Sequence, residues 1–278
     1  MAKTKPVIFY FRSLDTSGRD EIRVGPFCVG SFSVHFERSL NLSELDFVPV
    51  LGMGTGPLFD QAKRAQSFIE NHSSLKEKDS EIHFFGHSAG GLVAKLVASA
   101  PHLQKNLKSL ITVGTPNKDC QAAEWAASLP ESNPKVSKLY QLFGYNFKDK
   151  KSTFESFHEV AQETFDFPKE IITGSLICAP QRESWSPLYR WVHKLPVMKE
   201  FRHPSDGLIQ KESQYFGDHH WNFELDHIQQ IGFGGQRKEF LRMCKLLEKI
   251  WCDKDYQSLL SREISLSASF NSAREAES

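Results

Sequence analysis

The segment from residue 82 to residue 98 constrains the fold of this chain more than any other. A short apolar run, Ile82 to Phe85, is followed by Gly86-His87-Ser88-Ala89-Gly90, and then by an apolar helical pattern, Leu92 to Ala98. A G-x-S-x-G sequence between a strand and a helix is typical of a serine held on a sharp turn at the edge of a sheet. Glycine at both ends of the turn lets neighbouring backbones approach closely. The segment therefore predicts a layered α/β fold with Ser88 at the carboxyl edge of the sheet.

The rest of the apolar pattern also alternates strands with helices. Further strands are predicted at Val7 to Phe11, Phe47 to Leu51, Leu110 to Val113 and Ile171 to Cys178. Two helices are predicted from apolar residues spaced by four, three and four positions, namely Leu58, Ala62, Ala65 and Ile69, and Phe240, Cys244, Leu247 and Trp251. Such alternation predicts a mostly parallel central sheet with helices on both faces.

Composition excludes several classes of protein. Of the 278 residues, 40% are hydrophobic and 24% charged, as in an ordinary globular domain. Lys plus Arg is 34 and Asp plus Glu is 34, so the basic excess of a nucleic-acid binder is missing. No apolar run reaches the ~18 residues of a transmembrane segment. The start of the chain lacks the apolar stretch of a signal peptide, so we expect a cytoplasmic protein. Five scattered cysteines without a CxxC pair predict neither a zinc cluster nor a disulfide framework.

The alternation of strands and helices is interrupted between residues 117 and 170. This stretch is helical in character and carries many aromatic and leucine residues. We expect it to be a helical insertion over a core made of residues 1–116 and 171–260. From 261 to 278 the composition turns to Ser, Glu, Ala and Arg, which predicts a flexible tail.

A serine nucleophile needs a base, and the base needs an acid that orients it. In this topology the acid follows the serine along the chain and the histidine comes last. The strongest candidate for the acid is Asp206, which lies in a Ser-Asp-Gly turn. Asp218 and Asp226 are weaker alternatives.

Three late histidines are candidates for the base. His227 precedes the last predicted helix, and it completes the order that begins with Ser88 and Asp206, so it is the predicted base. His219 and His220 form a polar pair that suits the surface or a metal site.

The turn around Ser88 supplies one candidate for an oxyanion donor and one for a residue of the substrate pocket. The helix after Ser88 directs the free N–H groups of its first turn at the serine, which predicts the N–H of Ala89 as an oxyanion donor. His87 points the wrong way along the turn to act as the base, so we place it in the wall of the substrate pocket.

Together these segments resemble the α/β-hydrolase superfamily, and more narrowly the bacterial true lipases (triacylglycerol lipases). The matching segments are Gly54 to Gly56, Gly86 to Gly91, Ile111 to Pro116, Ser205 to Ser213 and Trp221 to Gln230. The resemblance implies an α/β-hydrolase fold with the triad Ser88, Asp206 and His227. It also implies that residues 117–170 form a helical lid, which would contact a lipid interface transiently. No cofactor is implied.

The chain departs from the family pattern in two places. The family usually carries His-Gly after the first strand, where a loop N–H is the second oxyanion donor. Here Phe11 and Arg12 stand in that place, followed by Ser13, which becomes the predicted donor. Phe11 and Arg12 are predicted to contact substrate, with Arg12 at the rim, where it would bind an anionic head group or a substrate carboxylate. Relatives with a calcium site keep an Asp after the histidine, whereas this chain has Gln229, so no metal is expected.

The implied activity is the hydrolysis of acyl esters or lipids through an acyl-serine intermediate. A phospholipase, a thioesterase or a short-chain esterase would use the same three residues. The alternative from another class is a catalytically silent binding protein of the same fold, which the altered loop at Phe11 and Arg12 favours.

Overall fold

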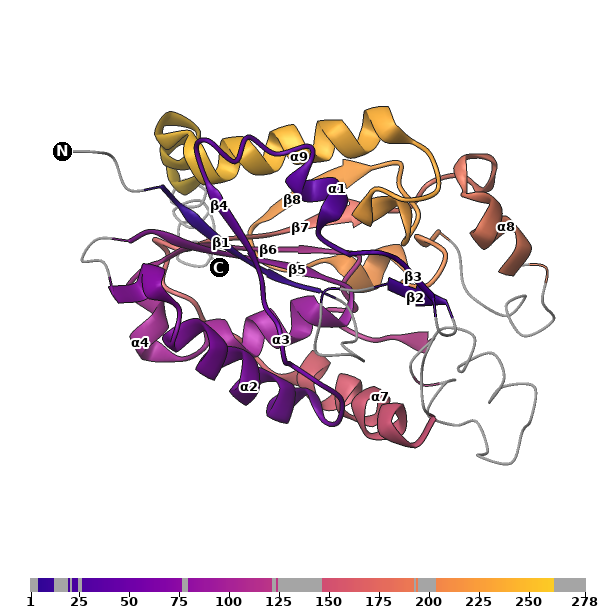
Figure 1. Ribbon diagram of the computed structural model, residues 1–278, viewed down its shortest axis with the longest axis horizontal. Coiled ribbons are helices and arrows are strands. Elements are labelled where there is room, and N and C mark those ends of the chain that lie inside the picture. The colour runs from indigo at the N-terminus through magenta and orange to yellow at the C-terminus, as the bar shows by residue number, and fades with distance from the viewer. Residues whose placement is uncertain are drawn as a thin grey trace, which may run out of the picture.

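A six-stranded sheet, with every neighbouring pair parallel, lies at the centre of the molecule in the order β4-β1-β5-β6-β7-β8 (Figure 1). The computed structural model describes residues 5–12, 20, 22–24, 27–76, 80–121, 124, 147–192, 194 and 204–262. The sheet strands are β1 (Val7–Phe11), β4 (Asp46–Pro49), β5 (Ile82–His87), β6 (Leu107–Val113), β7 (Ile172–Cys178) and β8 (His219–Phe223). An antiparallel ribbon of β2 (Ile22–Val24) and β3 (Phe27–Gly30) forms a separate small sheet.

Helices cover both faces of the central sheet (Figure 1). One face carries α1 (Val34–Glu37) and α9 (Arg237–Cys252). The other carries α2 (Leu58–Glu70), α3 (Ala89–Ala98), α4 (Pro101–Gln104) and α7 (Phe147–Gln162). The remaining elements are α8 (Pro187–Val192) and the short 3₁₀ turns η1 (Ser73–Lys76), η2 (Arg182–Ser184), η4 (Lys211–Gln214) and η5 (Gln229–Ile231).

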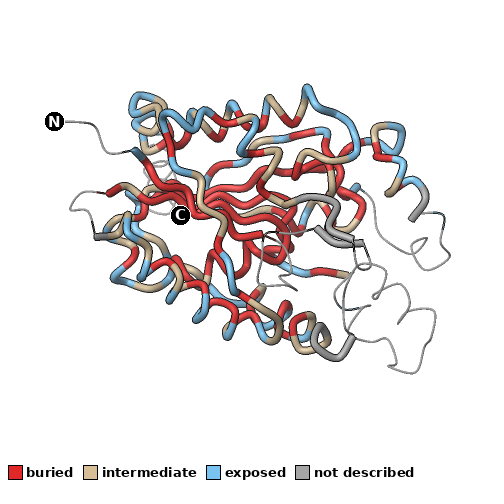
Figure 2. Tube along the Cα trace, in the orientation of Figure 1, coloured by how far each residue is buried: buried red, intermediate tan, exposed pale blue. Residues whose placement is uncertain are grey.

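The alternation of side chains along β1 divides the core into two layers. Val7, Phe9 and Phe11 pack in the cluster that α2, α3 and α7 complete. Ile8 and Tyr10 pack in the opposite cluster with the inner face of α9. Because side chains of a strand alternate between faces, a strand buried on both sides is apolar throughout. Figure 2 shows the result, with buried strands between helices whose outer sides are exposed.

The predicted sheet is confirmed, with differences in the extent of its strands. The strand before Ser88 runs on to His87, and the next one begins at Leu107 rather than Leu110. The edge strand β8 was not predicted. Only its first and last residues, His219 and Phe223, are buried, so its sequence lacks an apolar run.

The predicted insertion at 117–170 is described in part. Its helix α7 is joined to the start of α2, because Thr153 Oγ1 donates to the carbonyl of Gly56 at 2.8 Å and the N–H of Leu58 donates to Ser156 Oγ at 2.9 Å. Phe157 is buried in the same layer. This half of the insertion is therefore a fixed part of the helical layer.

Two predictions fall largely outside the described residues. Residues 122–123 and 125–146 of the insertion are among those not described, so the lid stays a prediction. Of the predicted tail, residues 261 and 262 end a helix that begins at 254, and 263–278 are not described. Among the described residues, no helix is long and apolar enough to cross a bilayer.

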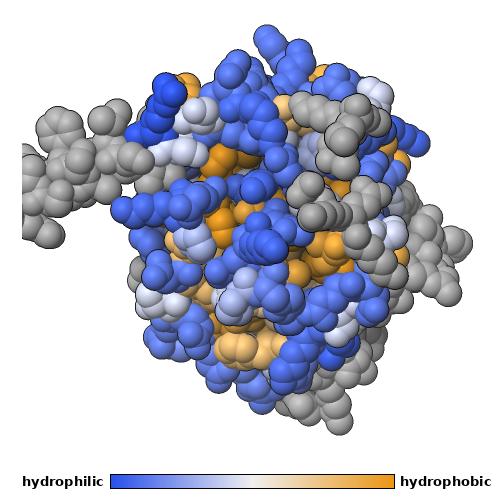
Figure 3. Space-filling model, turned by 90° about the vertical axis from the view of Figure 1, so that its left-hand side faces the viewer, coloured by the Kyte–Doolittle hydropathy of each residue, from blue (hydrophilic) through white to orange (hydrophobic). Residues whose placement is uncertain are grey.

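The two ends of the sheet differ in character. Figure 3 shows the end at which the strands begin, where hydrophilic side chains cover most of the surface and interrupt the apolar patches. The segments predicted to carry chemistry follow the opposite, carboxyl ends of β1, β5 and β8.

Candidate active site

Ser88 lies on a strained turn between β5 and α3. Its backbone has φ 55° and ψ −132°, a region that residues with a side chain rarely adopt. The flanking glycines make the turn possible. A Cβ at Gly90 would lie 2.2 Å from the carbonyl oxygen of Phe11, and one at Gly86 would lie 2.4 Å from the Cα of Gly91. Strain of this kind clusters at functional sites, where the surrounding structure maintains it.

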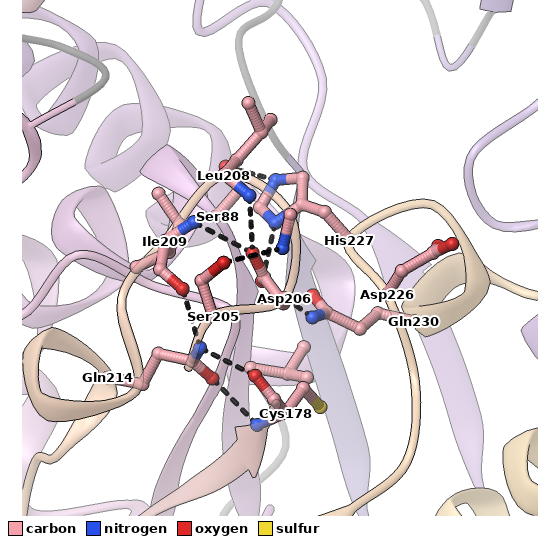
Figure 4. A network of polar contacts seen from close by, with 12 residues as sticks. Ser88, Cys178, Ser205, Asp206, Leu208, Ile209, Gln214, Asp226, His227 and Gln230 are labelled. Carbon is pink, nitrogen blue, oxygen red and sulfur yellow. Dashed lines mark hydrogen bonds and ion pairs between the residues drawn. The ribbon is translucent and has the colours of Figure 1, made fainter. Parts of the chain in front are cut away.

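The structure brings Ser88, His227 and Asp206 together in one chain of hydrogen bonds (Figure 4). The hydroxyl of Ser88 lies 2.9 Å from His227 Nε2, and His227 Nδ1 lies 2.8 Å from Asp206 Oδ2. A carboxylate only accepts, so the proton between the last two belongs to Nδ1, and Nε2 is left to accept from the serine. All three residues are buried, with Ser88 8% exposed and His227 7% exposed.

The Asp206 carboxylate is fully buried and accepts four hydrogen bonds. Oδ1 accepts from the N–H groups of Leu208 at 3.0 Å and Ile209 at 2.8 Å. Oδ2 accepts from His227 and from Gln230 Nε2, the latter at 2.7 Å. A buried charge needs such partners, because an unpaired one would be expensive to remove from water. The Ser-Asp-Gly turn is thus built around the carboxylate.

Gln214 holds this turn against the end of β7. The strand β7 ends at Cys178, and residues 195–203, directly before the segment of the turn, lie outside the described part of the chain. The N–H of Cys178 donates to Gln214 Oε1 at 2.7 Å, and Gln214 Nε2 donates to the carbonyls of Cys178 at 2.8 Å and Ile209 at 3.1 Å (Figure 4). The sequence gives no signal for Gln214, because a glutamine in a turn has the same sequence pattern whether its side chain is exposed or buried.

The weaker candidates for the acid lie elsewhere. Asp226 points away from Asp206 (Figure 4) and accepts from the N–H groups of Ser186 at 2.6 Å and Gln229 at 2.9 Å. Burial raises the pKa of the Asp226 carboxyl. Asp218 precedes β8, at the opposite end of the sheet from Ser88, and accepts from Thr173 Oγ1 at 3.1 Å.

The histidine pair is also remote from Ser88. His219 and His220 open β8 at its amino end. His220 Nδ1 lies 3.1 Å from Ser175 Oγ. Of the three late histidines, only His227 contacts the serine.

His87 packs against the candidate base. Its Nε2 donates to the carbonyl oxygen of His227 at 3.2 Å, and the two ring centroids are 4.8 Å apart. Burial, with a smaller contribution from the charge of His227, lowers the pKa of His87 well below 6.5. The ring is therefore neutral at neutral pH and supports the loop that carries His227.

The predicted oxyanion and substrate residues have different outcomes. Ala89 is the first residue of α3, so its N–H lies outside the helix's own hydrogen bonds, next to Ser88. Ser13 lies outside the described residues. Phe11 is buried in the core, with its ring edge-on to Phe84 at 5.0 Å. Arg12 was expected at the rim, but it is 1% exposed.

The position of Arg12 has a physical cause. Its guanidinium lies 3.8 Å from the carboxylate of Asp20 and 5.6 Å from the ring centre of Phe32. The N–H of Ser33 donates to the same carboxylate at 3.0 Å. An acidic partner and an aromatic face together stabilise a buried guanidinium, so this side chain turns inward.

Metal and disulfide chemistry have no visible site in the part of the chain that the structure describes. No group of three or more His, Cys, Asp or Glu residues there is arranged to hold a metal ion. Cys120, Cys178, Cys244 and Cys252 are free thiols.

Comparisons with known proteins agree with this architecture. A family model described as a PGAP1-like alpha/beta domain matches residues 50–141, which include the Ser88 turn. No curated protein sequence matches the chain. Among solved structures, the mature lipase of Bacillus licheniformis superposes with a TM-score of 0.56 at 13% identity, over 87% of this chain and 92% of that one.

Two further structures give the same result. The Staphylococcus hyicus lipase has a TM-score of 0.55 at 11% identity, over 95% of this chain and 98% of that one. A metagenomic carboxyl esterase has a TM-score of 0.55 at 14% identity, over 91% of this chain and 77% of that one. The α/β-hydrolase fold predicted from the sequence is therefore confirmed.

Proposed function

We propose that this chain, which has the α/β-hydrolase fold, is a lipase-like serine hydrolase of carboxylic esters. The observation that carries the proposal is the hydrogen-bonded chain from Ser88 through His227 to Asp206. The lipase and esterase structures of the same fold support it.

In this proposal each of the three side chains has its own role. His227 Nε2 takes the proton of Ser88 as its oxygen attacks the ester carbonyl, and Asp206 orients the imidazole and offsets its positive charge. The imidazolium then protonates the departing alcohol, which leaves an acyl-serine. His227 next takes a proton from water, which attacks the acyl carbon, and then returns that proton to the Ser88 oxygen as the acid leaves.

The negative oxygen of the intermediate needs hydrogen-bond donors. The N–H of Ala89 is one donor in this proposal, at the start of α3 where the helix dipole is positive. Ser13 stays the proposed second donor. Removing one donor of this kind costs ~10²–10³-fold in turnover.

The first test compares ester turnover by the wild type and by Ser88→Ala. We expect kcat/KM to fall by about 10⁴-fold or more, because the nucleophile is lost while the fold remains. Ser67→Ala, on the exposed side of α2, is the matched control and keeps wild-type turnover. Equal rates for wild type and Ser88→Ala would remove the serine from the mechanism.

A fluorophosphonate probe tests the alternative of a silent binding protein. We expect the probe to label Ser88 in the wild type, because the His227 contact activates the hydroxyl. An intact, folded chain that resists labelling would support the binding protein instead.

Acyl esters are the proposed substrates, with transient contact to a lipid interface through residues 117–170. A series of soluble and emulsified esters of increasing chain length tests this assignment. A rise in turnover at the emulsion supports a lipase, whereas a preference for short soluble esters supports an esterase. Phospholipid and thioester substrates in the same series test the two remaining alternatives.

A further inference from the structure

Gln230 contacts Asp206, the acid of the proposed catalytic triad, and has no role in the mechanism proposed above. It lies in η5, directly after the loop of His227, and is fully buried. Its Nε2 donates to Asp206 Oδ2 at 2.7 Å. The same oxygen accepts the hydrogen bond of His227 Nδ1 at 2.8 Å. Two donors from one loop thus converge on one carboxylate oxygen (Figure 4).

The fold leaves space for this contact at Gly114, at the end of β6. Gly114 has φ 53°, and a Cβ there would lie 2.1 Å from Gln230 Oε1 and 2.9 Å from Asp206 Oδ2. The backbone at this point therefore accommodates both the amide and the carboxylate. A side chain at position 114 would displace the pair.

The neighbouring glutamine has separate partners. Gln229 Oε1 accepts from the N–H of Asp226 at 2.9 Å, and its Nε2 donates to the carbonyl of Ser184 at 3.1 Å. It is almost as buried as Gln230 and belongs to the same 3₁₀ turn. Two adjacent glutamines thus provide a matched pair, of which only Gln230 contacts Asp206.

We propose that Gln230 is a positioning residue that limits how strongly Asp206 holds the protonated imidazole of His227, and so extends activity to lower pH. The inference rests on the proposed ester hydrolysis. A hydrogen bond to a carboxylate stabilises its charge. When that donor is removed, the buried carboxylate has one partner fewer and attracts the imidazolium more strongly. His227 then stays protonated, and unable to act as a base, up to a higher pH.

Other titratable groups around the pair do not produce this effect. His87 and Cys178 both face the site and are neutral at neutral pH, because burial lowers the pKa of the imidazole and raises that of the thiol. Asp226 is directed away from Asp206 and bonded to backbone N–H groups (Figure 4). Gln230 also contacts His87 and raises the pKa of that imidazole, so replacing Gln230 lowers this pKa further and leaves the His87 ring neutral.

The experiment measures kcat/KM against pH for the wild type, Gln230→Met and Gln230→Asn. Methionine keeps the length and apolar packing without a donor, and asparagine keeps the amide but is one methylene short of Asp206. We expect the acid limb of both variants to move up by about half a pH unit to one unit. Gln229→Met is the control, and it loses thermal stability while its acid limb stays in place.

The possible outcomes test the role of Gln230 and the proposed ester hydrolysis separately. A wild type that neither turns over esters nor reacts with a fluorophosphonate contradicts the proposed function. An active wild type whose two Gln230 variants fold but keep the wild-type acid limb contradicts the positioning role alone. Lower activity at every pH without a shift would make Gln230 merely structural. Should Gln230→Met fail to fold, Gln230→Asn decides the question.

Discussion

At the scale of single residues, the Ser88 turn depends on the absence of side chains where backbones meet. A Cβ at Gly90 would lie 2.2 Å and 2.3 Å from the carbonyl oxygens of Phe11 and Arg12. Both neighbours are backbone atoms, one in the last residue of β1 and one in the residue after it, so no side chain can rotate to relieve the contact. The start of α3 and the end of β1 would have to move apart.

Gly90→Ala should therefore reduce both stability and ester turnover. We expect a loss of about 1–3 kcal/mol, as for overpacking, measured by urea unfolding. We also expect turnover to fall at least tenfold, about 1.4 kcal/mol of barrier, because Ala89 moves with the helix. Gly235→Ala is the control for turnover, since a Cβ there meets nothing within 4 Å, while its φ of 107° strains any side chain and so costs this variant stability as well. A Gly90→Ala variant with the control's activity would contradict the packing argument.

At the scale of elements, α3 carries a buried lysine on the side that faces the segment after α7 and the loop before β8. The Lys95 ammonium lies 4.9 Å from the ring centre of Phe165 and 5.3 Å from that of Phe216. Burial lowers its pKa from 10.5 to about 7. The unfolded chain binds this proton more readily than the folded one, so stability is lost as the pH falls from 10.5 towards 7.

Lys95→Met should stabilise the protein, because it keeps the aliphatic packing and removes the charge. At pH 7 we expect a gain on the order of a few kcal/mol, less the lost cation–π attraction, at about 1.4 kcal/mol per pKa unit. The gain should shrink at pH 10, where the unfolded chain holds the proton less fully. Unfolding curves at both pH values measure it, with Lys63→Met on the 80% exposed Lys63 as control. A gain independent of pH would show that packing, and not charge burial, is responsible.

Elements differ in how far the sequence could reveal them. The strand β1 is buried on both faces and is a continuous apolar run, so it was predicted. The strand β7 is equally buried and was also predicted, although Thr173, Gly174 and Ser175 interrupt its apolar residues. The edge strand β8 is buried only at its first and last residues, so its sequence has no apolar run. The ribbon of β2 and β3 is too short to show a recognisable pattern. Helices α2 and α9 were predicted because one face of each packs on the sheet.

The site was predictable for a related reason. Ser88, Asp206 and His227 follow in a fixed order, and each lies in a short recognisable segment. Of the supporting glutamines, Gln214 lies outside these segments, and Gln230 ends the segment of His227 without a predicted role of its own. Their importance comes from burial beside Asp206, and burial is decided by how distant parts of the chain pack.

At the scale of the whole molecule, β5 places neutral histidines in the middle of the structure. His83 is fully buried, and its Nδ1 lies 2.8 Å from Ser109 Oγ on β6. Burial, with smaller contributions from Lys254 and Lys108, lowers the pKa of His83 from 6.5 to about 3. The folded state therefore loses stability as the pH falls from 6.5 towards 3, because the unfolded chain takes up the proton first.

His83→Gln should make the protein less sensitive to acid. Glutamine can bond to Ser109 but does not titrate, so we expect the loss between pH 7 and pH 4 to shrink by on the order of 3 kcal/mol. Denaturant unfolding at both pH values measures the change. The exposed His158→Gln is the control and keeps the wild-type pH dependence. An unchanged acid sensitivity in His83→Gln would place the loss at other groups.

The distance along the chain between Ser88 and His227 has a consequence for biosynthesis. The two residues are 139 positions apart, and the imidazole arrives with the final strand and its loop. At ~5–20 residues per second, a ribosome needs roughly 7–28 s to get from one to the other. Throughout that interval the nascent polypeptide displays the hydroxyl without the group that activates it. Under the proposed mechanism, reactivity begins only after translation has passed the last loop, and a growing chain cannot attack the lipids around it.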